Sequence, residues 1–270
     1  MTAPLFHLEP GRLDGVEVGG QVVLDGAEGH HAATVMRLSS GEEIQLSDTR
    51  RLRVTGEVIE AARGELTVVV SDVRREPLER PRLVLVQALA KDRRDLQAVE
   101  SATELGIEAV VPWEAERSVA RWKAGREAKK HAEWVSIVRT AAKQTRRTAV
   151  PEVEQLHTTA QYCRRIVEQA GVAVVVLHET EERSLDGALR ELNAVDAEEL
   201  HLVVGPEGGI TPGEIERLVS SGARVARLGR TVLRSSTAGP AALAGVQVLL
   251  GRWSGPGSPE AGASGPVRRQ

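Results

Sequence analysis

Hydrophobic residues in the first 73 positions fall in short runs that are separated by glycine, aspartate and other polar residues. Four of these runs are rich in β-branched residues and predict strands, at residues 22–24, 43–46, 53–59 and 65–70. One short helix is expected over residues 28–37. Several short strands at such close spacing are typical of a small β-barrel.

The pattern changes after a polar stretch with two prolines at residues 74–82. Continuous apolar runs, which predict buried strands, alternate with segments of helical periodicity, above all 92–105 and 124–147. Buried strands that alternate with helices favour a parallel sheet covered on both faces. The apolar runs lie at residues 83–88, 109–111, 172–177, 202–204 and around residue 225.

These patterns divide the chain into four parts. Residues 1–73 form a small β domain, 74–82 a linker, and 83–250 an α/β domain, because composition and periodicity change at these points. Residues 251–270 are rich in glycine, serine and proline and are expected to be disordered.

Composition narrows the class of protein. Only 2% of residues are aromatic, so the core must consist of valine, leucine, isoleucine and alanine. The single cysteine, Cys163, excludes a disulfide framework and a cysteine-rich zinc site, and no metal is expected. No apolar run approaches the ~18 residues of a membrane span, and the N-terminus lacks the features of a signal peptide, so a cytoplasmic protein is expected.

Charge is unevenly distributed. The chain has a net charge of −3, but residues 117–147 contain ten lysines or arginines and only two glutamates. Such a local basic block suggests a polyanionic partner, although a solvated helical face would have the same composition.

The most informative stretch is residues 200–249. An apolar run ends in Gly205-Pro206-Glu207-Gly208-Gly209. A helix start follows, with Thr211 as N-cap, Pro212 at the first helical position and Glu214 in the first turn. Two further loops, at 228–230 and 233–238, leave the same region. Open α/β sheets bind ligands at such loops, although a tight strand-to-helix turn would also account for the glycines.

The chemistry of these loops argues against a phosphate site. The chain has neither a G-x-G-x-x-G nor a G-x-x-x-x-G-K-[ST] motif, and the carboxylate of Glu207 would repel a phosphate. Arg234 stands between the end of a strand and the start of a helix, where a guanidinium could hold a phosphate or stabilise an oxyanion. Ser236 and Thr237 are expected to cap the last helix.

Five segments together resemble the 16S ribosomal RNA uracil-N3 methyltransferase family, which belongs to the knotted SPOUT class of S-adenosylmethionine-dependent enzymes. The resemblance runs in order from about residue 30 to residue 247. The segments are HHAATVMRLSSGE, ATELGIEAVVPWEAERSV, AAKQTRRTAVPEV, LVVGPEGGITPGEIE and RLGRTVLRSSTAGPAAL.

The resemblance implies a fold and a cofactor. The fold would be a SPOUT knotted parallel sheet covered by helices, with a trefoil knot, an N-terminal PUA-like β-barrel that binds RNA, and a homodimer. S-adenosylmethionine, which carries no phosphate, would bind between three loops. The implied cofactor-binding residues are Leu177, His178, Glu179, Gly205, Pro206, Glu207, Gly208, Gly209, Leu228, Gly229, Leu233, Thr237 and Ala238.

The resemblance also implies a reaction. The methyl group would pass to N3 of a uridine in 16S ribosomal RNA of the small subunit, and Arg234 would stabilise the uracil anion or its phosphate. The implied RNA-binding residues are His31, Arg37, Lys91, Arg94, Arg117, Gln144 and Arg147.

The chain departs from the family pattern at three positions. Ser236 replaces a glutamate, Thr145 replaces a serine, and Ser101 stands where a lysine is usual. Two alternatives therefore stay open: a SPOUT methyltransferase acting on tRNA or a ribose 2′-hydroxyl, and a non-catalytic RNA-binding ribosome-assembly factor. A dinucleotide-dependent oxidoreductase is disfavoured, because its glycine fingerprint is absent.

Overall fold

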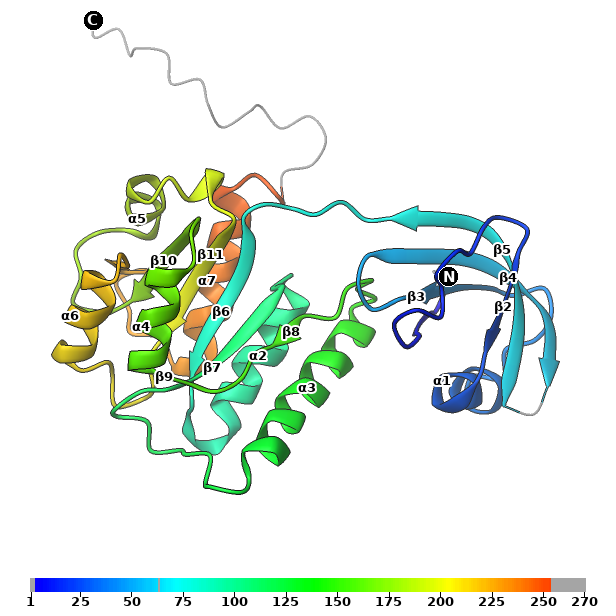
Figure 1. The fold of residues 1–270 in the computed structure, drawn as a ribbon, viewed down its shortest axis with the longest axis horizontal. Coiled ribbons are helices and arrows are strands. Elements are labelled where there is room, and N and C mark those ends of the chain that lie inside the picture. The colour runs from blue at the N-terminus through cyan, green and yellow to red at the C-terminus, as the bar shows by residue number, and fades with distance from the viewer. Residues whose placement is uncertain (1–2, 63, 254–270) are drawn as a thin grey trace, which may run out of the picture. The chain divides into compact units, whose positions relative to one another are not determined.

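A computed structural model describes residues 3–62 and 64–253 (Figure 1). The chain divides into two compact units. The N-terminal unit contains residues 1–79 together with 126–153, and the sheet unit contains residues 80–125 and 154–270. Residues 126–153, which the sequence pattern assigned to the α/β domain, thus group with the β domain. The expected disordered tail lies outside the described residues from residue 254 onward.

The N-terminal unit is built on a five-stranded sheet with the order β1-β3-β4-β5-β2. Only β1 and β3 are parallel, and the other neighbours are antiparallel. The three-residue β1 was not predicted, because so short a run has no alternation to detect. The strands are β1 (Leu5–His7), β2 (Gln21–Leu24), β3 (Glu43–Ser47), β4 (Leu52–Ala62) and β5 (Glu65–Arg75).

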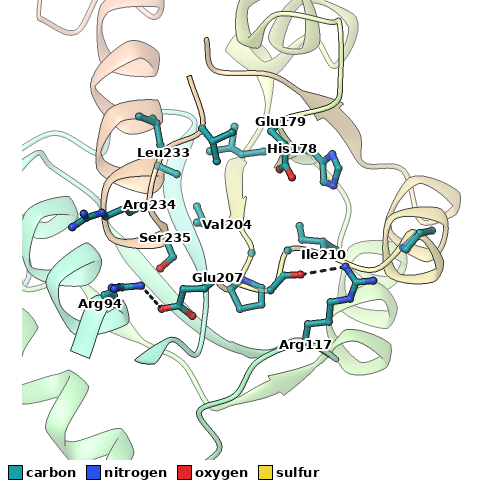
Figure 2. A pocket seen from close by; sticks show the side chains of 18 residues that line it. Arg94, Arg117, His178, Glu179, Val204, Glu207, Ile210, Leu233, Arg234 and Ser235 are labelled. Atoms are coloured by element: carbon teal, nitrogen blue, oxygen red, sulfur yellow. Dashed lines mark hydrogen bonds and ion pairs between the residues drawn. The ribbon is translucent and has the colours of Figure 1, made fainter. Parts of the chain in front are cut away.

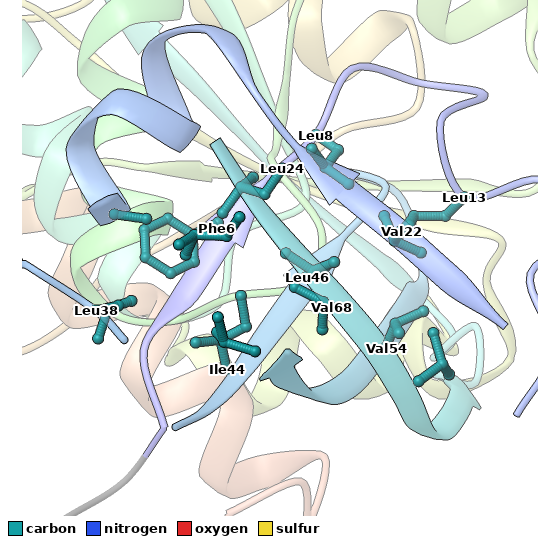
Figure 3. Close-up of a cluster of buried hydrophobic side chains, with 14 of the residues drawn as sticks. Phe6, Leu8, Leu13, Val22, Leu24, Leu38, Ile44, Leu46, Val54 and Val68 are labelled. Atoms are coloured by element: carbon teal, nitrogen blue, oxygen red, sulfur yellow. The ribbon is translucent and has the colours of Figure 1, made fainter. Parts of the chain in front are cut away.

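The inward face of this sheet forms one apolar core. Along β4, Leu52, Val54 and Val58 are buried and lie an even number of residues apart, so their side chains point to the same face of the sheet. This is the alternation expected of a half-buried strand. Figure 3 shows Phe6, Ile44 and other side chains from neighbouring strands meeting in this cluster. In place of one helix over 28–37, the chain forms α1 (Gly26–His30) and a π-helical turn (His31–Val35).

The long helix α3 (Glu127–Gln144) belongs to this unit. Trp134, Val138 and Ala141 are buried along one side of it, as their helical spacing predicted. After the helix, the segment 145–150 bonds to the sheet. The Ser47 hydroxyl donates to the Thr148 carbonyl at 2.5 Å, and Arg53 Nε donates to Thr148 Oγ1 at 2.8 Å. These bonds join two parts of the chain that are about a hundred residues apart. The short β8 (Glu152–Val153) ends this part of the chain.

The sheet unit contains a parallel sheet in which β12, β10, β11, β6 and β7 are neighbours in that order, with β9 beside β7. All residues of β11 are buried, which explains its continuous apolar pattern. The strands are β6 (Arg82–Ala88), β7 (Ala109–Glu114), β9 (His157–Thr158), β10 (Val172–Leu177), β11 (Glu199–Val204) and β12 (Arg224–Ala226).

Helices cover both faces of this sheet, as predicted. Tyr162 and Ile166 of α4 and Leu218 of α6 pack on one face with Val84 and Val86. On the other face α7 lies against Leu85 and packs on α2. The helices are α2 (Arg94–Glu104), α4 (Thr159–Glu168), α5 (Leu185–Glu191), α6 (Pro212–Ser220) and α7 (Ser235–Leu249), with short 3-10 turns at Lys91–Arg93 and Ala194–Asp196.

The order of the strands positions the site. Strands β10, β11 and β12 are parallel neighbours, so their carboxyl ends lie at one edge of the sheet. The loops that follow them, after residues 177, 204 and 226, therefore meet there, although they are far apart in the sequence. Among the described residues, no helix is both long enough and apolar enough to span a membrane.

Candidate active site

A cavity of about 570 Å³ opens at this edge of the sheet (Figure 2). Its walls come from the loops after β10 and β11, from the loop before α7, and from the starts of α2 and α7. A smaller cavity of about 70 Å³ shares Leu177, Leu233 and four other residues with it. Both volumes together lie in the range of small-molecule sites.

Twelve of the thirteen residues expected to bind a cofactor line these two cavities. Leu228 and Gly229 line only the smaller one. The larger one is lined by Leu177, His178, Glu179, Gly205, Pro206, Glu207, Gly208, Gly209, Leu233 and Ala238. The remaining residue, Thr237, is exposed within the first turn of α7 and lines neither cavity.

The expected capping of α7 by Ser236 or Thr237 is wrong. The helix begins at Ser235, and its N-cap is Arg234, which has extended backbone angles and makes no side-chain cap bond. Ser236 and Thr237 therefore lie one residue or more inside the helix. The sequence suggested otherwise because serine and threonine are far commoner caps than arginine.

The predicted start of α6 is confirmed. Thr211 is its N-cap and forms a reciprocal capping box with Glu214, and Pro212 occupies the first helical position. Glu214 is fully buried, and its Oε1 accepts hydrogen bonds from the Glu116 amide at 2.9 Å and from the Thr159 hydroxyl at 2.6 Å. These bonds connect the end of the glycine-rich loop to two other segments of the sheet unit and so hold this end of the loop in place.

Two arginines that were expected to contact RNA, Arg94 and Arg117, line the larger cavity. Arg94 Nη1 donates to Glu207 Oε1 at 3.3 Å, and the Lys91 amide donates to the same oxygen at 3.2 Å. On the other side of the loop, Arg117 Nη1 donates to the Gly208 carbonyl at 3.2 Å. The loop 205–209 is thus held from both sides. Glu207 forms an ion pair with Arg94.

Arg234 lies at the edge of the larger cavity, exposed to solvent. Its guanidinium has no hydrogen-bond partner in the described part of the chain, so all its donors are available to a ligand. Figure 2 places Arg234 and Arg94 on the same side of the cavity, opposite His178 and Glu179.

The other RNA-binding candidates lie in the N-terminal unit. Arg37 and Gln144 are exposed, and Arg37 has a left-handed φ of 57°. His31 is half-buried, with its ring edge-on to Phe6 at a centroid distance of 6.4 Å. The carbonyl of the half-buried Arg147 bonds to the ring of His7 at 2.8 Å, and burial lowers the pKa of His7. The candidates thus fall into two groups, one in each unit.

Five residues that line the larger cavity were missed by sequence reasoning. Val204 and Ile210 are buried apolar residues on either side of the glycine-rich loop, a position that could have marked them as walls of a pocket. No sequence pattern marked Ser235 as a site residue, because residues 233–238 were interpreted as a loop. The others are Pro212 and Val232. Within residues 3–62 and 64–253, no group of three histidine, cysteine, aspartate or glutamate side chains is placed to bind a metal.

A parallel α/β sheet with a loop-lined cavity at its carboxyl edge, joined to a small β unit, is the architecture expected of an RNA methyltransferase of the SPOUT class. Comparison with known families agrees with this class. Residues 77–247 match the RNA methyltransferase domain, and residues 24–71 match the RNA methyltransferase PUA domain. The small β unit is therefore PUA-like, as expected.

The chain belongs to the ribosomal RNA small subunit methyltransferase E family. It is 43% identical over 256 residues to the enzyme of that name from Mycobacterium tuberculosis, covering 94% of both chains. It is 29% identical to the one from Bacillus subtilis, covering 80% of this chain and 85% of that protein.

Solved structures agree with this assignment. A ribosomal RNA small subunit methyltransferase E from Neisseria gonorrhoeae, bound to S-adenosylmethionine, superposes with a TM-score of 0.77 at 25% identity, covering 92% of this chain and 98% of that one. A methyltransferase from Legionella pneumophila in complex with the same cofactor gives a TM-score of 0.76 at 26% identity, covering 92% and 98%.

Proposed function

We propose that this protein transfers a methyl group from S-adenosylmethionine to N3 of a uridine in 16S ribosomal RNA of the small subunit. The observation that carries the proposal is the cavity at the carboxyl edge, which brings together twelve of the thirteen residues expected to hold the cofactor. The names of the relatives support the substrate, and the two cofactor-bound structures support the methyl donor. The choice of uridine N3 rests on the family resemblance.

The lining of the cavity suits S-adenosylmethionine. Leu177, Val204, Ile210 and Leu233 supply apolar contacts for an adenine ring, and the loops offer backbone amides and carbonyls for its polar edge. The buried hydroxyl of Ser235 has no hydrogen-bond partner among the described residues, which is a feature of a polar ligand site. The lining combines arginines with glutamates, as a cofactor that carries both signs of charge requires.

The cofactor, when bound, supplies an electrophilic methyl group on a positively charged sulfur. The residues of the chain have two tasks in the reaction. The loops position the donor against the base, which reduces the entropic cost of the encounter. Arg234, at the edge of the cavity, would stabilise the negative charge that develops on the uracil as N3 loses its proton.

The RNA would be held by basic and polar residues of both units. His31, Arg37, Gln144 and Arg147 would supply contacts from the N-terminal unit, and Lys91 and Arg117 would supply contacts near the cavity. A base in a stacked region must leave its stack to reach the cavity. We further propose a homodimer that acts in the cytoplasm, where ribosomal RNA is found, and a functional division into a PUA-like domain over 1–73 and a methyltransferase domain over 83–250.

Mass mapping of ribosomal RNA tests the proposal. Cells lacking the protein are expected to lose one N3-methyluridine from 16S ribosomal RNA, and purified protein with S-adenosylmethionine is expected to restore it on small subunits. Loss of a methyl group from tRNA or from a ribose 2′-hydroxyl would assign the enzyme to another RNA. A protein that binds RNA without binding S-adenosylmethionine would be a non-catalytic factor. This alternative is tested because Ser236 replaces the glutamate of the family pattern.

A further inference from the structure

Three polar side chains form a group on one wall of the larger cavity. They are Arg94 at the start of α2, Glu207 in the glycine-rich loop and Ser235 at the start of α7. Figure 2 shows the Ser235 hydroxyl directed toward Glu207 and the Arg94–Glu207 ion pair beside it. None of the three lines the smaller cavity, which is formed by residues 227–229 and 231–233, by residues 177–179 at the end of β10 and just after it, and by Ala238. The two ends of the site therefore have different linings.

The Arg94–Glu207 pair is held in place before any ligand arrives. Both the Lys91 amide and Arg94 Nη1 donate to Glu207 Oε1. The other carboxylate oxygen, Oε2, has no hydrogen-bond partner in the described part of the chain. The turn that carries Lys91 and Arg94 contains two non-glycine residues with left-handed φ, Asp92 at 54° and Arg93 at 59°. Such a conformation is costly and persists only where surrounding contacts hold it. The bonds to Glu207 are contacts of this kind.

Ser235 supplies the second observation. The residue is 6% exposed, and its hydroxyl oxygen is buried without a hydrogen-bond partner among the described residues. A buried hydroxyl in this state destabilises the fold, and a bound polar group offsets that cost by restoring the hydrogen bond. Because Ser235 is also the first residue of a 15-residue helix, its surroundings favour negative charge.

We infer that Arg94, Glu207 and Ser235 bind the amino-acid end of S-adenosylmethionine. This end carries one carboxylate and one ammonium group. The guanidinium of Arg94 and the hydroxyl of Ser235 donate to the carboxylate, and the open oxygen of Glu207 accepts from the ammonium. The inference rests on the proposed function, and it assigns Arg94 to the cofactor and not to an RNA phosphate. The adenosine end then occupies the apolar part of the site, near Leu228 and Leu233.

Two cofactor fragments test the inference by calorimetry. S-adenosylhomocysteine keeps the amino-acid end, whereas 5′-methylthioadenosine lacks it. Arg94→Gln, Glu207→Gln and Ser235→Ala are each expected to weaken binding of S-adenosylhomocysteine, by about 10-fold for the two charged residues, because charge-assisted hydrogen bonds are removed. Binding of 5′-methylthioadenosine is expected to stay within about 2-fold of the wild type, which also shows that the pocket is folded. Arg164→Gln, an exposed change on α4 that lines neither cavity, is the control and should alter neither affinity.

The outcomes separate the inference from the proposed function. If the wild type binds S-adenosylhomocysteine no better than 5′-methylthioadenosine, or if the variants weaken both equally, the inference is wrong while the cofactor assignment stands. If Arg94→Gln leaves both affinities unchanged and lowers only affinity for RNA, Arg94 is an RNA contact and the inference is overturned. If the wild type binds neither compound nor S-adenosylmethionine, the proposed function fails and the inference fails with it.

Discussion

Gly208 lies directly against Arg117. A Cβ atom added at Gly208 would stand 3.0 Å from the Cβ of Arg117 and 3.2 Å from its carbonyl oxygen. The Arg117 side chain in turn donates to the Gly208 carbonyl at 3.2 Å. The glycine at this position is therefore explained by close packing between two segments of the sheet unit, and this packing sets the shape of one wall of the cavity.

We expect Gly208→Ala to weaken binding of S-adenosylmethionine by about 10-fold, because the added methyl group displaces the loop from Arg117 and each 1.4 kcal/mol of strain is roughly a factor of ten in affinity. Calorimetric titration measures the effect. Gly213→Ala is the matched control, since a Cβ there meets nothing within 4 Å and alanine suits the helix α6. Equal affinities for the two variants would mean that the loop does not need this packing.

Replacing Arg234 by alanine is expected to lower the rate of methyl transfer by about 100-fold or more, which is the usual effect of removing one group that stabilises developing charge. Single-turnover assays on small subunits measure this rate. Affinity for S-adenosylmethionine should change little, because Arg234 lies at the edge of the cavity. Arg164→Ala, an exposed change on α4 that lines neither cavity, serves as the control. Full activity of Arg234→Ala would show that its role is assigned wrongly.

RNA binding should depend on the segment that follows α3. The double variant Arg146→Gln with Arg147→Gln is expected to weaken RNA binding and to reduce the slope of log K against log salt by about one for each phosphate that is no longer neutralised. Filter-binding titrations at several salt concentrations measure the slope. Removing the charge of Arg164, which lies on α4 in the other unit, provides a comparison. An unchanged slope in the double variant would mean that the basic block is only a solvated surface.

Acid stability should depend on Glu199. Its carboxylate accepts a hydrogen bond from His201 at 2.9 Å and pairs with Arg82 and Arg165, and these contacts lower its pKa from 4.5 to about 2. The folded state therefore holds the charged form more strongly than the unfolded chain does. This stabilisation is complete above pH 4.5 and is lost as the pH falls toward 2.

The stability difference between the wild type and Glu199→Gln tests this statement. We expect the free energy of unfolding of the two proteins to differ by about 2 kcal/mol at pH 7. This figure is the energy of the lowered pKa of Glu199, reduced because solvent partly screens the charges. The difference should become smaller as the pH falls through the acid range. Denaturant titrations at several pH values measure it. Glu168→Gln, an exposed change on α4, should give a small difference at every pH. If the difference in the free energy of unfolding between the wild type and Glu199→Gln does not become smaller at low pH, the stabilising role of the Glu199 carboxylate is contradicted.

Local patterns in the sequence predicted most of the elements. The continuous apolar runs of β6, β10 and β11 marked buried parallel strands, because strands covered on both faces have no polar side. The capping box of α6 could also be predicted, since Thr211 and Glu214 act within one turn of helix. The motifs of the glycine-rich loop and of the Leu233–Arg234 region identified the family, and with it the loops that we propose bind the cofactor.

Contacts between distant segments were decided only by the tertiary structure. No local pattern assigns residues 126–153 to the β unit, because the bonds of Ser47 and Arg53 to Thr148 join segments about a hundred positions apart. The pairing of Arg94 with Glu207, the buried hydroxyl of Ser235 and the start of α7 at Ser235 are likewise set by packing. Periodicity and caps depend on neighbours within a few residues, whereas the chemistry of a site depends on which loops the order of the strands brings together.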